Sequence, residues 1–160
     1  MRILVVSDTH GQNNNFFQVV EEEGPFDMVI HCGDAEGSEY ILEQAAGCPL
    51  HIVMGNCDFF SDLPKEEEFE VAGKKILVTH GHYYSVNCGV ETLMEEAEAR
   101  DIDIAIFGHT HRPTIAYGKK AMVINPGSLS YPRQEGRQCS YMVMELEEDE
   151  APDCQIGYLS

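Results

Sequence analysis

The stretch IDIAIFGHTH, residues 102–111, joins a run of apolar residues to two histidines that are separated by one threonine. Side chains two positions apart lie on the same side of an extended chain, whereas in a helix they point in widely different directions. We therefore expect a buried β-strand here, which delivers His109 and His111 to one place at its carboxyl end.

Strand and helix patterns alternate in the first half of the chain. Short apolar runs with the length of buried strands lie at 2–6, 27–30 and 51–54, and segments with helical spacing lie between them at 16–23 and 38–46. Strands that alternate with helices in this way favour a parallel sheet.

Hairpin patterns dominate the second half. Two apolar runs surround Ala72-Gly73, and a helical segment at 90–100 precedes the strand described above. From residue 114 onward, short strands and turns follow one another, which favours antiparallel pairing. The sequence thus predicts an α/β fold with mixed sheets, in a single domain over residues 1–160.

Acidic residues outnumber basic ones by 28 to 10, which gives a formal charge of −18 at pH 7. Such a charge repels nucleic acid and anionic membranes at long range. Acidic runs of the kind that is typical of a solvated surface lie at 21–23, 65–70, 95–101 and 145–150. We expect neither duplex nucleic acid nor a membrane as a partner, and a homo-oligomer is left open.

The cysteines and the first residues bear on the cellular compartment. Six cysteines are scattered without a CxxC pair, and Met1 leads directly into a strand pattern without an export signal. No apolar run approaches the ~20 residues that a membrane span needs. The sequence predicts reduced thiols and a cytoplasmic location.

Side chains that can bind metals recur where the predicted strands end. In open α/β folds, ligands bind outside the carboxyl ends of the strands. A single histidine at such a place is usually a surface residue, but several donors on one rim favour a metal site. Seven carboxylate, amide or imidazole groups, each near a glycine, occupy these places: Asp8, His10, Asp34, Asn56, His80, His109 and His111.

Seven protein ligands are more than one ion usually takes. Two ions that share a carboxylate would have about four protein ligands each, with open positions for water and substrate. A mixture of imidazoles and carboxylates suits manganese, iron, zinc or nickel better than magnesium or calcium. We expect two divalent ions, with Mn²⁺ first and Ni²⁺, Fe²⁺ or Zn²⁺ as alternatives.

The motifs around these residues resemble those of one family. DTHG (8–11), CGD (32–34), GNCD (55–58), THGH (79–82), GHTH (108–111) and NPGS (125–128) occur in the order found in calcineurin-like metallophosphoesterases. Within that family the chain is most similar to the small YfcE-type phosphodiesterases. The resemblance covers essentially the whole chain. It implies two mixed β-sheets packed as a sandwich with helices on the outside, an α/β/β/α arrangement.

The resemblance also implies a ligand set and an activity. By the family pattern, one ion would be held by Asp8, His10 and His111, the other by Asn56, His80 and His109, with Asp34 as the bridge. The implied reaction is the hydrolysis of small phosphodiesters by a metal-bridging hydroxide, without a protein nucleophile.

Three further residues are candidates for substrate contact: Cys57, Asp58 and His82. Cys57 stands where many relatives carry a histidine that is thought to protonate the leaving group, although YfcE-type members share the cysteine. We interpret Cys57 first as a small residue that fits, and we expect a cationic centre beside it to lower the pKa of its thiol. Arg133 is a candidate phosphate clamp, with a solvated arginine as the simpler interpretation.

Other functions fit the same family. The fold also serves as a protein-binding subunit of a membrane-coat sorting complex, in which the metal site is degraded, but all seven positions are intact here. Nucleases and protein phosphatases usually need added elements or a basic groove, which this sequence lacks. A phosphomonoesterase or nucleotide phosphatase is left as an alternative.

Overall fold

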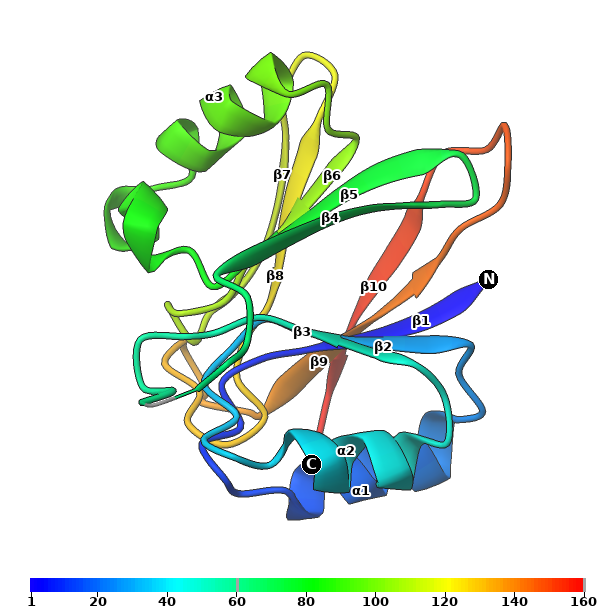
Figure 1. Cartoon of the computed structure of the whole chain (residues 1–160), viewed down its shortest axis with the longest axis vertical. Helices are drawn as coiled ribbons and strands as arrows, with labels where there is room; N and C mark the ends of the chain where they lie inside the picture. The colour runs from blue at the N-terminus through cyan, green and yellow to red at the C-terminus, as the bar shows by residue number, and fades with distance from the viewer. Residues whose placement is uncertain (60, 160) are drawn as a thin grey trace.

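Two five-stranded β-sheets build the molecule in the computed structural model, which describes residues 1–59 and 61–159 (Figure 1). The first sheet has the strand order β10-β9-β1-β2-β3. Its strands are β1 (Arg2–Val6), β2 (Met28–His31), β3 (Leu50–Ile52), β9 (Ser140–Glu145) and β10 (Asp153–Tyr158). Strands β1, β2 and β3 are parallel, as their alternation with helices predicts, and β9 and β10 are antiparallel to their neighbours.

The second sheet has the order β4-β5-β6-β8-β7. Its strands are β4 (Glu66–Val71), β5 (Lys74–Thr79), β6 (Ile104–Ile106), β7 (Pro113–Tyr117) and β8 (Met122–Pro126). The predicted antiparallel pairing holds only for the two edges of this sheet, since β5, β6 and β8 are parallel. Strand β7 lies at the edge, so the returning strand β8 pairs with β6 in the same direction.

Helices cover the outer face of each sheet. Helices α1 (Asn14–Glu23) and α2 (Glu39–Ala46) lie against the first sheet, and α3 (Glu91–Ala99) lies against the second (Figure 1). None of the helices in the described part of the chain is long and apolar enough to cross a membrane.

Successive side chains along a strand point to opposite faces of its sheet, and this explains how the sheets and helices pack in layers. In β1, Ile3 and Val5 join the core between the two sheets, whereas Leu4 and Val6 face α1 and α2. A strand segment that is buried on both faces is apolar, as residues 3–6 of β1 and the whole of β6 are. The layers are therefore helix, sheet, sheet and helix, which confirms the predicted sandwich.

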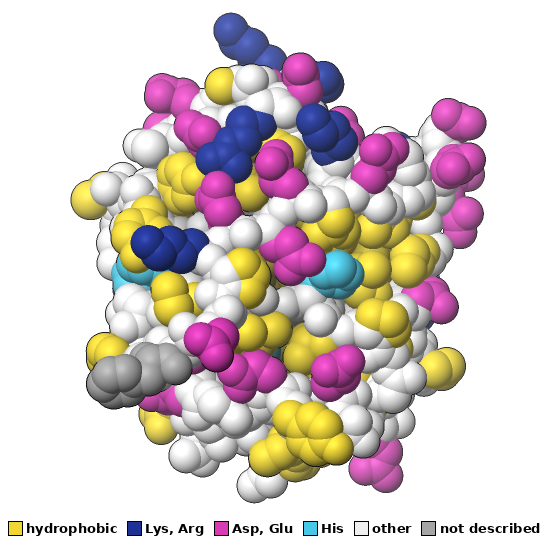
Figure 2. All heavy atoms as spheres, viewed as in Figure 1, with side chains coloured by type: hydrophobic (Ala, Val, Ile, Leu, Met, Phe, Trp, Pro, Cys, Tyr) yellow, Lys and Arg dark blue, Asp and Glu magenta, His cyan; other side chains and the backbone are white. Residues whose placement is uncertain are grey.

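The acidic runs lie at the surface. On the face seen in Figure 2, carboxylates are scattered rather than gathered into one patch. The run at 65–70 forms most of the edge strand β4, where charged side chains discourage pairing with another chain.

The parallel strands bring their carboxyl ends to one end of the sandwich. Backbone hydrogen bonds join the loops there: the Asp8 N–H donates to the Gly33 carbonyl at 3.0 Å, and the Gly108 N–H donates to the His80 carbonyl at 3.0 Å. Loops from both sheets thus meet at the place where the sequence puts its metal-binding side chains.

Candidate metal centre

The candidate ligands lie in loops that follow the strands. Five of the seven have a positive φ, between 49° and 70°: Asp8, His10, Asp34, His109 and His111. Positive φ is uncommon outside glycine and carries a conformational cost that is found mainly at functional sites. The loops therefore hold these side chains in conformations that a relaxed chain would avoid.

The strand predicted to reach His111 ends earlier, at Ile106. His109 and His111 both have left-handed backbone conformations, so they do not share one face of an extended chain. The His109 ring instead lies 5.0 Å from that of His80, while the His111 ring lies 5.2 Å from that of His10. Both imidazoles lie among the other candidate ligands, but the extended geometry expected of them is wrong.

Two glycines allow the loops to approach one another closely. A Cβ atom at Gly55 would collide with the Asp34 carboxylate, and one at Gly108 would collide with the Ser7 hydroxyl and the Asp8 carboxylate. Only glycine leaves the room that these contacts need.

Asp8 lies at the centre of the cluster and is fully buried. Its Oδ2 accepts hydrogen bonds from the Ser7 hydroxyl at 2.6 Å and the His109 N–H at 3.0 Å. Its Oδ1 has no hydrogen-bond partner among the described residues. Three imidazole nitrogens surround that oxygen: Nε2 of His10 at 3.8 Å, of His80 at 3.8 Å and of His111 at 3.3 Å.

The same three histidines have their other ring nitrogen occupied. In each, Nδ1–H donates to an oxygen outside the cluster: His10 to Glu36 at 3.2 Å, His80 to the Cys32 carbonyl at 2.7 Å, and His111 to the Tyr131 carbonyl at 2.6 Å. This arrangement turns each Nε2 toward Asp8, as in metal-binding histidines whose second nitrogen is fixed by an oxygen. A buried carboxylate oxygen without a hydrogen-bond partner, facing three imidazole nitrogens, fits a cation.

A second group of donors lies beside the first. The Asn56 Oδ1 lies 2.9 Å from His80 Nε2 and 3.1 Å from His109 Nδ1. The Asp34 Oδ2 lies between the two groups, 3.8 Å from His10 Nε2 and 3.3 Å from His80 Nε2. All seven predicted ligands therefore converge on one site. Three triads have donor atoms close enough to share an ion: Asp8, His10 and His111; Asp8, Asp34 and His80; and His10, Asp34 and Cys57.

Electrostatics keeps both carboxylates ionised. Burial alone would raise the pKa of Asp8, but the imidazoles of His111 and His80 hold it below its ordinary value. Burial acts against Asp34 too, yet His80 and the Cys57 N–H, which donates to Asp34 at 2.7 Å, lower its pKa well below the usual range. In turn the two carboxylates raise the pKa of His80 despite its burial. The site concentrates negative charge where a cation would bind.

Asp58 has a different place from the one expected of a substrate contact. It is 6% exposed, and its carboxylate accepts hydrogen bonds from the backbone N–H groups of Asp34, Glu36 and Gly55 at 2.7–2.8 Å. Asp58 therefore holds two of the site's loops together.

Cys57 and His82 lie beside the cluster. Cys57 contacts Asp34 through its N–H, and burial together with Asp34 raises the pKa of its thiol to about 11. In the protein alone, the carboxylates thus raise the pKa of the Cys57 thiol, whereas a cationic centre beside it is expected to lower that pKa. His82 begins a 3₁₀-helix (His82–Tyr84), so it is not extended, and its ring lies 5.4 Å from that of His80.

The predicted NPGS loop closes the site from the other side. The hydroxyls of Ser128 and Ser130 both donate to the Asp8 carbonyl at 2.8 Å, and the Asn125 amide donates to the Gly108 carbonyl at 3.1 Å. Sequence analysis did not identify the side chains that orient the histidines: Glu36 beside His10, and Asn87, whose Nδ2 lies 3.0 Å from His109 Nε2. No motif marks them, because both lie far along the chain from the histidines that they contact, Glu36 in a loop and Asn87 in a 3₁₀-helix (Val86–Cys88).

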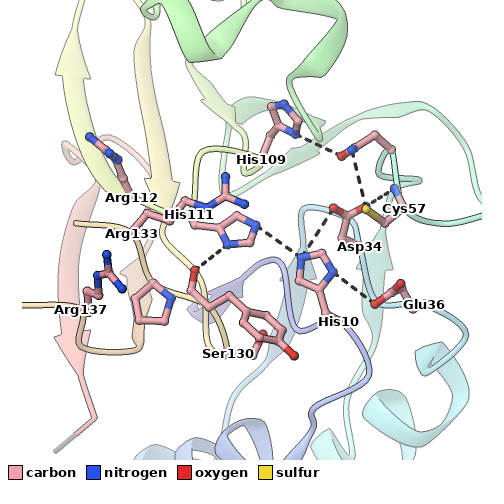
Figure 3. A pocket seen from close by; sticks show the side chains of 13 residues that line it. His10, Asp34, Glu36, Cys57, His109, His111, Arg112, Ser130, Arg133 and Arg137 are labelled. Carbon is pink, nitrogen blue, oxygen red and sulfur yellow. Dashed lines mark hydrogen bonds and ion pairs between the residues drawn. The ribbon is translucent and has the colours of Figure 1, made fainter.

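The cluster opens into a cavity of about 970 Å³. Figure 3 shows the donors facing this cavity. The predicted residues that line it are His10, Asp34, Asn56, Cys57, His109, His111 and Arg133.

The chain belongs to the calcineurin-like phosphoesterase superfamily, whose domain matches residues 1–149. It is 36% identical over 152 residues to the probable metallophosphoesterase YsnB of Bacillus subtilis, covering 94% of this chain and 88% of that protein. It is 29% identical over 145 residues to a protein of Methanocaldococcus jannaschii named a phosphodiesterase, covering 79% and 83%. The family resemblance drawn from the motifs is thus confirmed.

Solved structures agree with this assignment. A conserved protein of Streptococcus pneumoniae TIGR4, described as a predicted phosphoesterase, superposes with a TM-score of 0.83 at 31% identity, covering 97% of this chain and 87% of that one. Wild-type Vps29 of Entamoeba histolytica complexed with Zn²⁺ shares the fold, with a TM-score of 0.79 at 22% identity, covering 99% of each chain. Proteins of this family bind divalent metals, and the donor clusters described above are where this chain would hold them.

Proposed function

We propose that this protein is a metal-dependent phosphodiesterase that hydrolyses small diesters. The observation that carries the proposal is the unpartnered Oδ1 of Asp8, which faces the Nε2 atoms of three histidines whose Nδ1 atoms are already occupied. A buried ionised oxygen without a partner is costly, and divalent ions bound by the surrounding imidazoles are the groups that would satisfy it.

In this proposal the chain holds two ions. Asp34 would bridge them, which is supported by its place between His10 and His80. The mixture of oxygen and nitrogen donors suits Mn²⁺, with Ni²⁺, Fe²⁺ or Zn²⁺ as alternatives. The first ion would take Asp8, His10 and His111, and the second would take Asn56, His80 and His109.

When bound, such ions supply Lewis acidity and make water acidic enough to attack phosphorus at neutral pH. The chain's own residues hold the metal-binding side chains in place. Two of its hydroxyl groups lie near the site, but neither is placed to attack the substrate. The Ser7 hydroxyl is buried and donates to Asp8, and the Thr9 hydroxyl is buried against His31. Neither hydroxyl has the free approach that a protein nucleophile needs.

The substrate class is supported by the relative that is named a phosphodiesterase and by the size of the cavity. A cavity of about 970 Å³ accommodates a small diester, and the charge of −18 disfavours a polyanion such as duplex nucleic acid. A protein-binding scaffold of the same fold is the rival function, but an intact donor set favours the enzyme.

The test is a panel of phosphodiesters and phosphomonoesters assayed against a panel of divalent metals after treatment with a chelator. We expect the chelated protein to be inactive and Mn²⁺ to restore hydrolysis of diesters. Faster hydrolysis of monoesters would favour the phosphatase alternative, and a folded protein that hydrolyses neither class with any metal would favour the scaffold.

A further inference from the structure

The five arginines of the chain fall into two groups. Arg2 and Arg100 are each held by two glutamates, at 3.4–3.5 Å and 2.7–2.9 Å respectively. The other three are exposed, and no carboxylate of residues 1–59 or 61–159 forms an ion pair with them: Arg112, Arg133 and Arg137. In a chain with 28 acidic residues, three arginines without such a partner call for another explanation.

All three line the cavity that contains the candidate metal ligands, and we refer to Arg112, Arg133 and Arg137 as the arginine wall. Figure 3 shows the arginine wall on one side of His111 and His10, with Glu36 and Cys57 on the other side.

The backbone fixes the arginine wall to the site. Arg112 directly follows His111, and the Arg133 N–H donates to the His111 carbonyl at 3.0 Å. The Arg137 N–H donates to the Gln134 carbonyl at 3.0 Å and closes a turn of the same loop. The exposed guanidinium groups therefore start from anchored positions.

The opposite side of the cavity is acidic. Glu36 and Cys57 also line a neighbouring cavity of about 610 Å³, whose other charged residues are Glu39, Asp58 and Asp62. Beyond the wall, Arg112 and Arg133 also border a cavity of about 560 Å³ that is lined in part by Val86, Val90 and Phe107. The cavity over the metal ligands is thus polarised, positive at one end and negative at the other.

We propose that the arginine wall binds a second anionic group of the substrate. The preferred substrate is a phosphodiester in which one alcohol carries a phosphate or carboxylate and the other carries a neutral or cationic group. Guanidinium groups match the planar geometry of such anions, and the acidic end repels them, so the charged alcohol lies toward the wall. This inference rests on the proposed function and adds a substrate class and an orientation to it.

The experiment uses three p-nitrophenyl phosphodiesters with the same leaving group. The other alcohol carries no charge, a carboxylate or a phosphate. With the Mn²⁺-loaded protein, we expect a KM about tenfold lower for a charged diester than for the uncharged one. The charged diester with the lower KM identifies which anion the wall takes.

The variant Arg133→Gln tests the wall itself. It should raise the KM of the charged diesters about fivefold to tenfold and that of the uncharged diester less, because a charge-assisted contact is lost only by the former. Lys119→Gln is the matched control, since Lys119 is exposed in the β7–β8 turn and its loss changes the net charge equally. The metal content of each preparation is measured alongside.

Equal KM values for charged and uncharged diesters in the wild type would overturn the inference. So would equal effects of Arg133→Gln and Lys119→Gln, which would mean that only the net charge matters. If no diester is hydrolysed with any metal, the proposed function fails. Calorimetric binding of the phosphate-bearing diester to wild type and Arg133→Gln then still decides whether the wall binds the anion.

Discussion

His31 lies close to three of the candidate ligands, His10, His80 and His111, which we call the rim histidines. Its ring contacts Thr9, next to His10, and the carbonyl of the following residue, Cys32, accepts a hydrogen bond from His80. The surroundings of His31 and of the rim histidines nevertheless differ in one respect. His31 is fully buried and both its ring nitrogens have partners: Nδ1 accepts from the Gly33 N–H at 3.1 Å, and Nε2 donates to the Thr9 hydroxyl at 3.0 Å. In each rim histidine, Nδ1–H donates to an oxygen outside the cluster, whereas Nε2 lies among the other candidate ligands, within 3.8 Å of the Asp8 Oδ1.

A structural histidine thus differs from a candidate metal ligand in the surroundings of one ring nitrogen. The difference lies in what surrounds Nε2, so it depends on neighbours rather than on burial, since His80 is as buried as His31. His31 is a neutral ring in the protein alone, whereas the Nε2 atoms of the rim histidines face carboxylates that favour a bound proton or cation.

The largest effect is expected at the bridging position. Asp34→Asn removes the charge that lies between the two donor groups, and we expect it to lower turnover of a diester by about a thousandfold or more. Asp149→Asn is the matched control, because Asp149 is exposed and its positive φ of 62° suits asparagine. Metal content and kcat are measured for both. Full activity of Asp34→Asn would contradict the bridging role.

Substituting one histidine of each kind tests whether the two kinds differ in metal binding. His111→Gln should lose bound metal, while His31→Gln should keep two ions per chain and lower the free energy of unfolding by on the order of 2 kcal/mol. Elemental analysis and denaturant unfolding of the chelated proteins separate the two effects. Equal metal loss in both variants would remove the distinction drawn here.

Acid should destabilise the protein through His31. Burial lowers the pKa of His31 from 6.5 to about 4, so below pH 6.5 the unfolded chain takes up a proton that the folded protein resists. The stability from neutral His31 is therefore complete above pH 6.5 and falls as the pH drops toward about 4, by on the order of 3 kcal/mol in all.

The difference between wild type and His31→Gln isolates this contribution. In the chelated protein, the raised pKa of His80 changes stability with the opposite sign, but it does so in both proteins. Urea unfolding of each at several pH values gives the difference, which should shrink as the pH falls from 6.5 to 4. A difference that does not change with pH would contradict a neutral His31.

How much of the site could be predicted from the sequence depends on the kind of contact. The seven donors could be located because each follows an apolar run, and strands that are parallel put their ends together. The left-handed conformations at His109 and His111 could not be predicted, because the spacing of apolar residues indicates only regular helices and strands, and these two residues lie beyond β6.

The residues that contact the candidate ligands from distant parts of the chain could not be predicted from the sequence either. Glu36 orients His10 across 26 positions, and the Arg133 N–H reaches His111 across the β7–β8 hairpin. Asp58 was expected near the substrate from its motif, but its carboxylate turns to three backbone N–H groups. For the sheets, the parallel pairing of β6 with β8 depends on which strand of a hairpin takes the edge, and no local pattern decides that.

The smallest effect is expected at Cys57. Its thiol is a poor proton donor to a departing oxygen, because its pKa is about 11 in the protein alone and a thiolate beside bound cations would have no proton to give, so the rate should depend steeply on the pKa of the leaving group. Cys57→Ala should leave that slope nearly unchanged, because the N–H that donates to Asp34 is kept. A series of aryl and alkyl diesters measures the slope. A shallow slope in the wild type would mean that another acid is present, and His82→Ala would be the next variant.

Anomalous scattering from crystals grown with Mn²⁺ would locate the bound ions directly. We expect two peaks on either side of the Asp34 carboxylate, one beside Asp8, His10 and His111 and the other beside Asn56, His80 and His109. A single peak, or two peaks away from these donors, would contradict this expectation.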